Sequence, residues 1–133
     1  TLHAGSGMES KNYSHYKDVI SIIKPILDER GISILQIGET HDPHVDGTIS
    51  LLGKTKLRET FVILSKSMLH LSNDSFSYHV AGFYNVPLVT LFVPTFPNTC
   101  HPFWRGEHEF LSPDYSKFKP SYSPNEEEKR IDK

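Results

Sequence analysis

Apolar side chains recur with the period of a helix over residues 14–30. The positions that share this face are Tyr16, Val19, Ile20, Ile22, Ile23, Ile26 and Leu27. This spacing predicts an amphipathic helix rather than a strand, in which apolar positions alternate. Gly31 is a natural stop just after the last turn. Pro25 predicts a kink or an early end, because proline has no backbone N–H to donate.

Beyond this helix, short apolar runs alternate with further helical segments. We expect strands at residues 32–37, 49–52, 68–71 and 88–93, helices at 56–66 and 75–84, and a polar loop at 39–48. Residues 2–5 resemble the end of a strand that enters a glycine-containing loop. Strands that alternate with helices favour a parallel α/β sheet. The loops that follow such strands gather at one edge of the sheet, where ligands usually bind.

The composition of the sequence changes near Pro94, after which prolines and aromatic residues interrupt any regular pattern of apolar positions. We therefore expect residues 1–105 to form the α/β domain, and residues 106–133 to form a proline-containing, charged C-terminal extension. The chain also begins abruptly, with almost nothing ahead of its first strand. This predicts that it is one piece of a longer protein.

Composition narrows the classes of function. With 133 residues the chain is about one domain, and its formal net charge of −2 gives no basic field that would favour nucleic acid. No apolar run approaches the roughly 18 residues of a membrane span, and the start lacks the pattern of a signal peptide. The single cysteine, Cys100, is compatible with a reducing compartment. We expect a soluble, cytoplasmic protein.

Two segments have the chemistry of an anion site. In the first, glycines that include Gly7 let the backbone approach a ligand closely, Ser6 supplies a hydroxyl, and Lys11 supplies a positive charge for phosphate. Neither a Walker spacing nor Gly-x-Gly-x-x-Gly is present. Taken alone, a flexible loop that caps the following helix explains these residues as well.

The second segment is Asp74-Ser75, with His79 about one turn further on, between a predicted strand and a predicted helix. A helix N-terminus offers free backbone N–H groups and partial positive charge, which suits phosphate. The alternative is an ordinary N-cap, in which Asp74 or Ser75 accepts backbone hydrogen bonds without further function. In that case His79 is a partly buried core histidine.

Two further polar positions allow either role. Glu39 directly follows a predicted strand, where a carboxylate can accept hydrogen bonds from a ribose diol. A solvated loop glutamate is the local alternative. Thr55 is a reasonable N-cap for the next helix, and Glu59 lies one residue late for a reciprocal capping interaction. A structural role is favoured for that pair.

Metal binding and hydrolysis find less support. His41 and His44 are spaced like metal ligands, but Pro43 lies between them in a loop that no helix holds. We expect no metal and no cofactor. A nucleophile elbow of the Gly-x-Ser-x-Gly type is absent, and Asp74, Ser75 and His79 are too close in sequence for the usual triad.

In their order along the chain, these pieces resemble the C-terminal half of the ADP-heptose:lipopolysaccharide heptosyltransferases, a family of GT-B glycosyltransferases. The motifs are Gly5-Ser6, Ser10-Lys11-Asn12-Tyr13, Ile37-Gly38-Glu39, residues 53–59, Ser72-Asn73-Asp74-Ser75, His79-Val80-Ala81, Val86-Pro87, Leu91-Phe92 and Pro94-Thr95. The resemblance runs from His3 to about Pro102. Each motif is short, but their order and spacing make the set specific.

The resemblance implies an α/β fold, a Rossmann-like parallel sheet flanked by helices, as one half of a GT-B architecture. It implies that this domain holds the diphosphate of a nucleotide sugar. By position, Ser6 and Lys11 look like phosphate-loop contacts and Glu39 looks like the contact to the nucleoside. Asp74, Ser75 and His79 resemble the family's Asp-Ser/Thr-Gly-x-x-His element.

Two departures and one gap qualify what the resemblance implies. Phe76 stands where the family usually has glycine, and Tyr13 replaces the commoner tryptophan. The N-terminal Rossmann-like domain, which would supply a general base, is missing. We therefore expect the donor-binding half of a metal-independent glycosyltransferase, inactive when isolated. The alternative is a non-catalytic structural or interaction module that retains the fold.

Overall fold

The computed structural model of the chain describes residues 1–93, 95–100 and 106–114. In chain order the strands and helices are β1 (Leu2–His3), a 3-10 turn (Glu9–Lys11), α1 (Tyr16–Glu29), β2 (Leu35–Gln36), β3 (Ile49–Ser50), α2 (Leu57–Ser65), β4 (His70–Asn73), α3 (Phe76–Phe83), β5 (Leu88–Leu91), α4 (Pro97–Cys100) and β6 (His108–Leu111). Strand follows helix along most of this order, as the pattern of apolar runs predicts.

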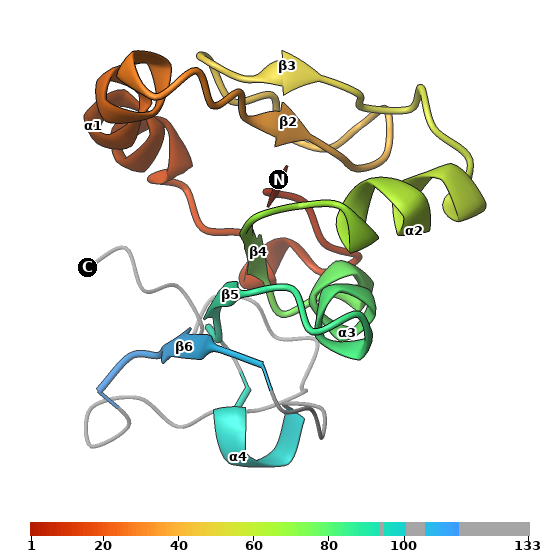
Figure 1. The fold of residues 1–133 in the computed structure, drawn as a ribbon. Helices are drawn as coiled ribbons and strands as arrows, with labels where there is room; N and C mark the ends of the chain where they lie inside the picture. The colour runs from red at the N-terminus through yellow and green to blue at the C-terminus, as the bar shows by residue number, and fades with distance from the viewer. Residues whose placement is uncertain (94, 101–105, 115–133) are drawn as a thin grey trace.

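The strands form one sheet in the order β3-β2-β1-β4-β5-β6, and every paired neighbour runs parallel. Helix α1 covers one face of the sheet, while α2 and α3 lie on the other side (Figure 1). The predicted parallel α/β sheet is therefore confirmed. Because the first strand lies in the middle of the sheet, the loops after β1, β2 and β4 are neighbours in space.

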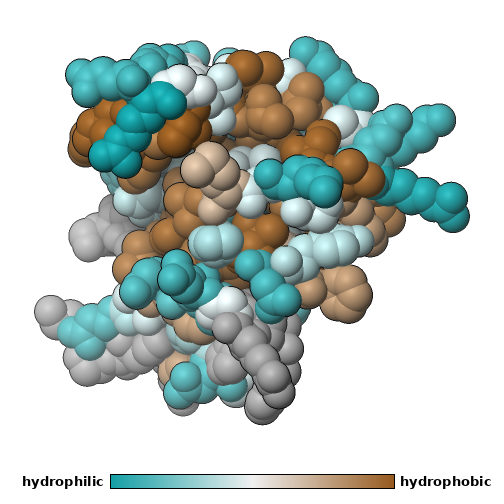
Figure 2. Space-filling model, viewed as in Figure 1, coloured by the Kyte–Doolittle hydropathy of each residue, from teal (hydrophilic) through white to brown (hydrophobic). Residues whose placement is uncertain are grey.

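Each face of the sheet carries its own apolar core. On the α1 side, Leu2, Ala4, Tyr16, Ile20 and Val45 are buried together. On the side of α2 and α3, the buried cluster is Ile37, Leu64, Tyr78, Ala81, Val86, Leu88 and Phe92. The view in Figure 2 also shows hydrophobic atoms at the surface. On α1 and α2 the exposed large apolar side chains include Ile22, Ile26, Leu57 and Val62.

The predicted first helix is confirmed at its end. Gly31 has φ of +66° and donates its N–H to the Asp28 carbonyl, and Ile32 donates to the Leu27 carbonyl. These two bonds are a Schellman motif, for which glycine is the favoured residue. Helix α1 continues through Pro25 to Glu29, so the early end that proline suggested is wrong.

The predicted start of α2 needs a correction. The N-cap is Lys56 rather than Thr55, and the Lys56 backbone N–H donates to Glu59 Oε2 at 2.7 Å. Glu59 is therefore at the third helical position, as a reciprocal cap requires. The Thr55 hydroxyl instead lies 2.9 Å from the Thr60 hydroxyl.

One strand was not anticipated. Residues of β6 pair in register with the whole of β5, from Leu88 opposite His108 to Leu91 opposite Leu111. The sheet thus includes residues that the sequence assigned to the C-terminal extension. The charged end of the chain, residues 115–133, lies outside the described residues, as does Pro94 of the last family motif.

Across the ranges that the structure describes, no helix is both long and apolar enough to cross a membrane.

Candidate functional site

A cleft of about 620 Å³ opens at the edge of the sheet where strands β1, β2 and β4 end. Its walls are the loops after these three strands and the first residues of α2 and α3. The lining residues are His3, Ser6, Gly7, Met8, Lys11, Gly38, Glu39, His41, Asp42, Thr55, Leu57, Thr60, Asp74, Ser75 and Phe76. We call this space the main cleft. It brings together both segments that the sequence marked as anion sites.

Lys11 and Asp74 form an ion pair inside the main cleft. Lys11 Nζ lies 2.8 Å from Asp74 Oδ2, and the Thr95 hydroxyl donates to the same oxygen at 2.7 Å. The side chains of Lys11 and Asp74 are only 15% and 7% exposed. Asp74 is therefore not a simple helix cap, because its carboxylate joins the loop after β1 to the loop after β4. The Lys11 ammonium is thus held within the cleft by a carboxylate partner.

The N-terminus of α3 faces the same cleft through Ser75. Ser75 has the extended backbone of an N-cap residue, yet its side chain makes no capping hydrogen bond. Its hydroxyl lies 3.0 Å from His3 Nδ1 and 3.1 Å from the Ser77 hydroxyl. The ordinary N-cap interpretation of Asp74-Ser75 is thus wrong for both side chains. The first-turn N–H groups, which carry the positive end of the helix dipole, are left uncapped by Ser75.

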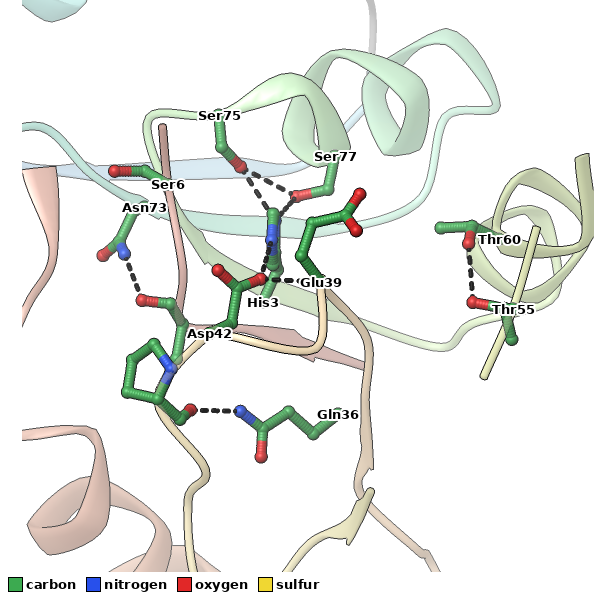
Figure 3. Close-up of polar contacts among 12 residues, drawn as sticks. His3, Ser6, Gln36, Glu39, Asp42, Thr55, Thr60, Asn73, Ser75 and Ser77 are labelled. Carbon is green, nitrogen blue, oxygen red and sulfur yellow. Dashed lines mark hydrogen bonds and ion pairs between the residues drawn. The ribbon is translucent and has the colours of Figure 1, made fainter. Parts of the chain in front are cut away.

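His3 and Asp42 are members of the site that sequence reasoning missed. His3 Nε2 lies 3.3 Å from Asp42 Oδ2, and the same oxygen accepts the Glu39 backbone N–H at 2.7 Å (Figure 3). Both side chains are almost fully buried. Burial lowers the pKa of His3, although the Asp42 carboxylate opposes that shift. The position of His3 in the sequence could have revealed it. His3 is the last residue of β1, just as Asn73 is the last residue of β4, and site residues follow both strands.

Two glycines make room for the Asp42 carboxylate. A Cβ added to Gly5 would lie 1.9 Å from Asp42 Oδ1, and one added to Gly38 would lie 2.2 Å from Asp42 Oδ2. Gly38 also has φ of +146°, a conformation that L residues rarely adopt. By contrast, a Cβ on Gly7 would meet nothing within 4 Å. The glycines of this site therefore serve different purposes, and only Gly5 and Gly38 are required by the packing.

The other predicted residues take different places. Ser6 lines the main cleft, but its hydroxyl donates to the Met8 carbonyl at 2.5 Å and so stabilises its own loop. Glu39 lines the wall with an exposed side chain. His79 is exposed on α3 and is not among the described residues that line the cleft. Partial burial lowers its pKa, and the charges of Asp74 and Lys11 act on it in opposite directions.

Phe76, the departure from the family pattern, lies on the wall of the cleft. Its ring meets the His3 ring edge-on, with the centroids 5.6 Å apart, and the residue remains 44% exposed. The phenyl ring therefore covers His3 from one side. The Lys11–Asp74 pair still lines the same cleft.

In the part of the chain that the structure describes, no group of three histidine, cysteine, aspartate or glutamate side chains is arranged to hold a metal ion. His44 instead approaches Asp46 at 4.0 Å on the surface. The cleft combines the Lys11 ammonium with a helix N-terminus, and together these suit a phosphate group.

The sheet order defines a Rossmann-like domain, and the cleft lies at the carboxyl edge of the sheet, where domains of this class usually bind ligands. A comparison with protein-family models matches residues 6–130 to glycosyltransferase family 9 (heptosyltransferase). The chain belongs to this family. A search among curated proteins finds no match.

Solved structures support the same fold. The chain is similar to E. coli ADP-heptose LPS heptosyltransferase II, with a TM-score of 0.67 and 21% identity over 83% of this chain and 37% of that one. It is similar to E. coli heptosyltransferase WaaC with ADP, with a TM-score of 0.68 and 16% identity over 84% and 37%. It also matches E. coli TibC in complex with ADP-D-beta-D-heptose, with a TM-score of 0.64 and 18% identity over 84% and 30%.

These matches confirm the expected fold, a Rossmann-like parallel sheet flanked by helices that makes up one half of a GT-B architecture. The chain spans only about a third of the length of the solved structures it matches, between 30% and 37% for these three.

Proposed function

We propose that the main cleft binds the diphosphate of a nucleotide sugar, and that the chain is the donor-binding half of a glycosyltransferase. The intact protein would transfer the sugar to an acceptor hydroxyl. The observation that carries this proposal is the meeting of Lys11 with the N-terminus of α3 in one cleft. Family membership supports the reaction class, and two structural neighbours are described with ADP or ADP-heptose.

The proposed chemistry is stabilisation of a leaving group. When the bond between sugar and diphosphate breaks, negative charge grows on the phosphate oxygens. Lys11 and the uncapped N–H groups at the start of α3 are already in place to stabilise that charge, so little reorganisation is needed. Asp74 holds Lys11 at 2.8 Å and keeps it within the cleft. No metal is required for this role.

The remaining predicted residues complete the proposed site. Glu39 is exposed on the wall, where its carboxylate can accept hydrogen bonds from a ribose diol. Gly7 leaves the backbone open for close approach, since even a Cβ there would touch nothing within 4 Å. Ser6 stabilises the conformation of this loop. His79 does not line the cleft, but it interacts electrostatically with Asp74 and Lys11.

A second Rossmann-like domain would close over this one in the intact protein. The length of the structural neighbours supports that expectation, because this chain aligns with only about a third of each. The general base belongs to that other half in the proposal. The isolated chain should therefore bind nucleotide weakly and catalyse nothing. The cytoplasmic location stays a prediction.

Calorimetric titration with ADP tests the binding site. The wild-type chain should bind at millimolar nucleotide, and Lys11→Ala should weaken binding about tenfold to a hundredfold, because a charge-assisted hydrogen bond contributes about 1.5–3 kcal/mol. Lys24→Ala is the matched control, since Lys24 pairs with Asp28 on α1 and does not line the cleft. An unchanged affinity for Lys11→Ala would remove Lys11 from the site.

The alternative is a structural or interaction module that has lost donor binding. Phe76 is the specific observation in its favour, because its ring stands on the cleft wall where the family usually has glycine. A folded chain that binds no nucleotide at millimolar concentration would favour this alternative. Restored binding in Phe76→Gly would then identify the phenyl ring as the cause.

A further inference from the structure

A continuous line of side-chain hydrogen bonds runs under α3 and ends in the main cleft. The Thr1 hydroxyl lies 2.9 Å from His70 Nδ1, and His70 Nε2 lies 2.9 Å from the Ser77 hydroxyl. The Ser77 hydroxyl lies 2.9 Å from His3 Nδ1, which is also 3.0 Å from the Ser75 hydroxyl. His3 Nε2 then meets Asp42 (Figure 3). Two buried imidazoles are thus linked through one serine.

The direction of each hydrogen bond follows from the far end of the line, where Ser67, between α2 and β4, meets Thr1. The Ser67 hydroxyl donates to the Ile63 carbonyl at 2.8 Å, so Ser67 Oγ accepts from the Thr1 hydroxyl at 3.1 Å. The Thr1 hydroxyl has then used its proton, and it accepts from His70 Nδ1–H. A neutral imidazole has one N–H, so His70 Nε2 must accept from the Ser77 hydroxyl.

His70 is neutral in this arrangement for a physical reason. It is fully buried, and burial lowers its pKa well below the ordinary value for histidine. The Ser77 proton is therefore committed to His70 and is not available to His3. His3 gives its Nε2–H to the Asp42 carboxylate, and the free lone pair on its Nδ1 accepts the Ser75 hydroxyl proton. In the ligand-free chain, Ser75 points its proton at His3.

A phosphate group in the cleft would change this arrangement. Phosphate oxygens are strong hydrogen-bond acceptors, so the Ser75 O–H turns toward them. His3 Nδ1 then faces two hydroxyl oxygens whose protons are both engaged elsewhere. A buried acceptor without a donor costs about 1–3 kcal/mol. A proton on Nδ1 removes that cost, because Nδ1–H can donate to Ser75 Oγ or Ser77 Oγ.

We propose that His3 takes up a proton from solvent when a nucleotide diphosphate binds, so that an imidazolium held by Asp42 becomes part of the anion site. The proposal rests on the proposed function, since it needs a phosphate in the main cleft. The new N–H bond at Nδ1 is balanced by loss of a proton from hydronium or a buffer acid, and no bond between heavy atoms forms or breaks. His3 is in this role a positioning residue, which acts on the phosphate through Ser75.

The groups around His3 favour such a switch. The loop after β2 contributes two carboxylates, Asp42 and Glu39, and both stabilise the charged ring. Strand β4 contributes His70, which opposes it when charged. The start of α3 contributes the Ser75 and Ser77 hydroxyls and the edge of the Phe76 ring. Lys11, Asp74 and His41 share the cleft. Burial keeps the free ring neutral, and an added phosphate charge reverses the balance.

The test is calorimetric titration of the folded chain with ADP at pH 7.5, in two phosphate-free buffers with different heats of ionisation. At this pH the terminal phosphate is already ionised, because its second pKa is about 6. The difference in observed heat then reports protons taken up by the protein. We expect a net uptake that approaches one proton per bound ADP. The affinity should fall as pH rises, by up to about tenfold per pH unit.

Variants assign the proton. His3→Gln should still bind ADP but should abolish the uptake, and Asp42→Asn should reduce it while His3 remains. His15→Gln is the control, because His15 is exposed beside Asp18 and lies outside the cleft. Circular dichroism establishes that each variant is folded. If His3→Gln does not fold, Asp42→Asn decides the question alone, and full uptake in that variant counts against the proposal.

The outcomes separate the two proposals. ADP binding without proton uptake overturns the role of His3 and leaves the proposed donor site intact. Uptake that persists in His3→Gln and disappears in His79→Gln also overturns it, since His79 senses Asp74 and Lys11. No ADP binding at all overturns both proposals.

Discussion

The two faces of the central sheet are built differently, although each is covered by helices. On the α1 face, the buried polar contacts include one closed set, in which the Tyr16 hydroxyl donates to Asn73 Oδ1 at 2.8 Å and Asn73 Nδ2 donates to the Ala4 carbonyl at 2.7 Å. On the opposite face, β1 and β4 place His3 and His70 beneath α3.

Strands β4 and β5 carry a further pair of buried polar side chains. Ser72 and Thr90 stand opposite each other on β4 and β5, and both hydroxyls are buried without a hydrogen-bond partner among the described residues. The α1 face stabilises the fold with apolar packing and neutral hydrogen bonds, which include the network of Tyr16, Asn73 and Ala4. The α3 face combines an apolar core with titratable groups that lead to the cleft. The two buried histidines lie on the α3 face, and we expect them to make the stability of the chain depend on pH.

The largest expected effects test the apolar packing that both faces of the sheet have in common. Ile20→Ala on the buried side of α1 and Leu64→Ala on the buried side of α2 should each lower the free energy of unfolding by about 2–5 kcal/mol, because each removes a buried side chain and leaves a cavity. Urea unfolding measures both. Ile22→Ala is the control, since that side chain is 70% exposed and should change stability by about 0.5 kcal/mol or less. A small loss for Leu64→Ala alone would mean that apolar packing does not hold the α3 side.

A smaller effect tests the neutral network. Tyr16→Phe removes the donor to Asn73 Oδ1 and should lower the free energy of unfolding by about 1–3 kcal/mol. Burial raises the pKa of Tyr16 well above its usual value, so the hydroxyl keeps its proton at any working pH. The loss should therefore be equal at pH 8 and pH 6. A loss that changes with pH would contradict the division between the faces.

The smallest expected effect is the change in the free energy of unfolding with pH, and it tests the face that carries the buried histidines. Burial lowers the pKa of both His70 and His3 in the folded chain. Below about pH 6.5, the ordinary pKa of histidine, these two side chains bind protons in the unfolded chain but stay neutral in the folded chain. The contribution of these two histidines to stability is thus complete above that pH and declines as pH falls. Each histidine contributes a slope of up to about 1.4 kcal/mol per pH unit.

Urea unfolding between pH 7.5 and 5.5 measures this slope. His70→Gln should lower the slope by up to about 1.4 kcal/mol per pH unit, because one titrating group is lost. His15→Gln at the surface should leave the slope unchanged. Identical slopes for the wild-type chain and for His70→Gln would show that His70 is not held neutral by the fold.

Local patterns predicted much of the fold. The helical period before Gly31 and the alternation of strands with helices depend on neighbours in sequence, and both are confirmed. The strand β6 was missed because its four residues lie among prolines and are held by β5, which is distant in the chain. The start of α2 was misplaced by one residue, since threonine is normally the better cap than lysine.

The site was predictable only in part. Asp74 was found because it directly follows a strand, and Lys11 because it lies in the glycine-containing loop after the first strand. The sheet order then makes the two loops neighbours. His3 and Asp42 were missed because no local pattern links residues that are 39 positions apart. The cradle that Gly5 and Gly38 form for Asp42 also exists only after folding.

In the proposed site, a nucleotide diphosphate binds where Lys11 meets the start of α3. Titration of the ¹⁵N-labelled chain with ADP, followed by amide chemical shifts, tests it most directly. We expect the largest shifts at Gly7, Lys11, Glu39, Ser75 and Phe76. Shifts confined to the second cleft, about 410 Å³ beside Tyr13 and Lys17, would contradict it, as would no shift at millimolar ADP.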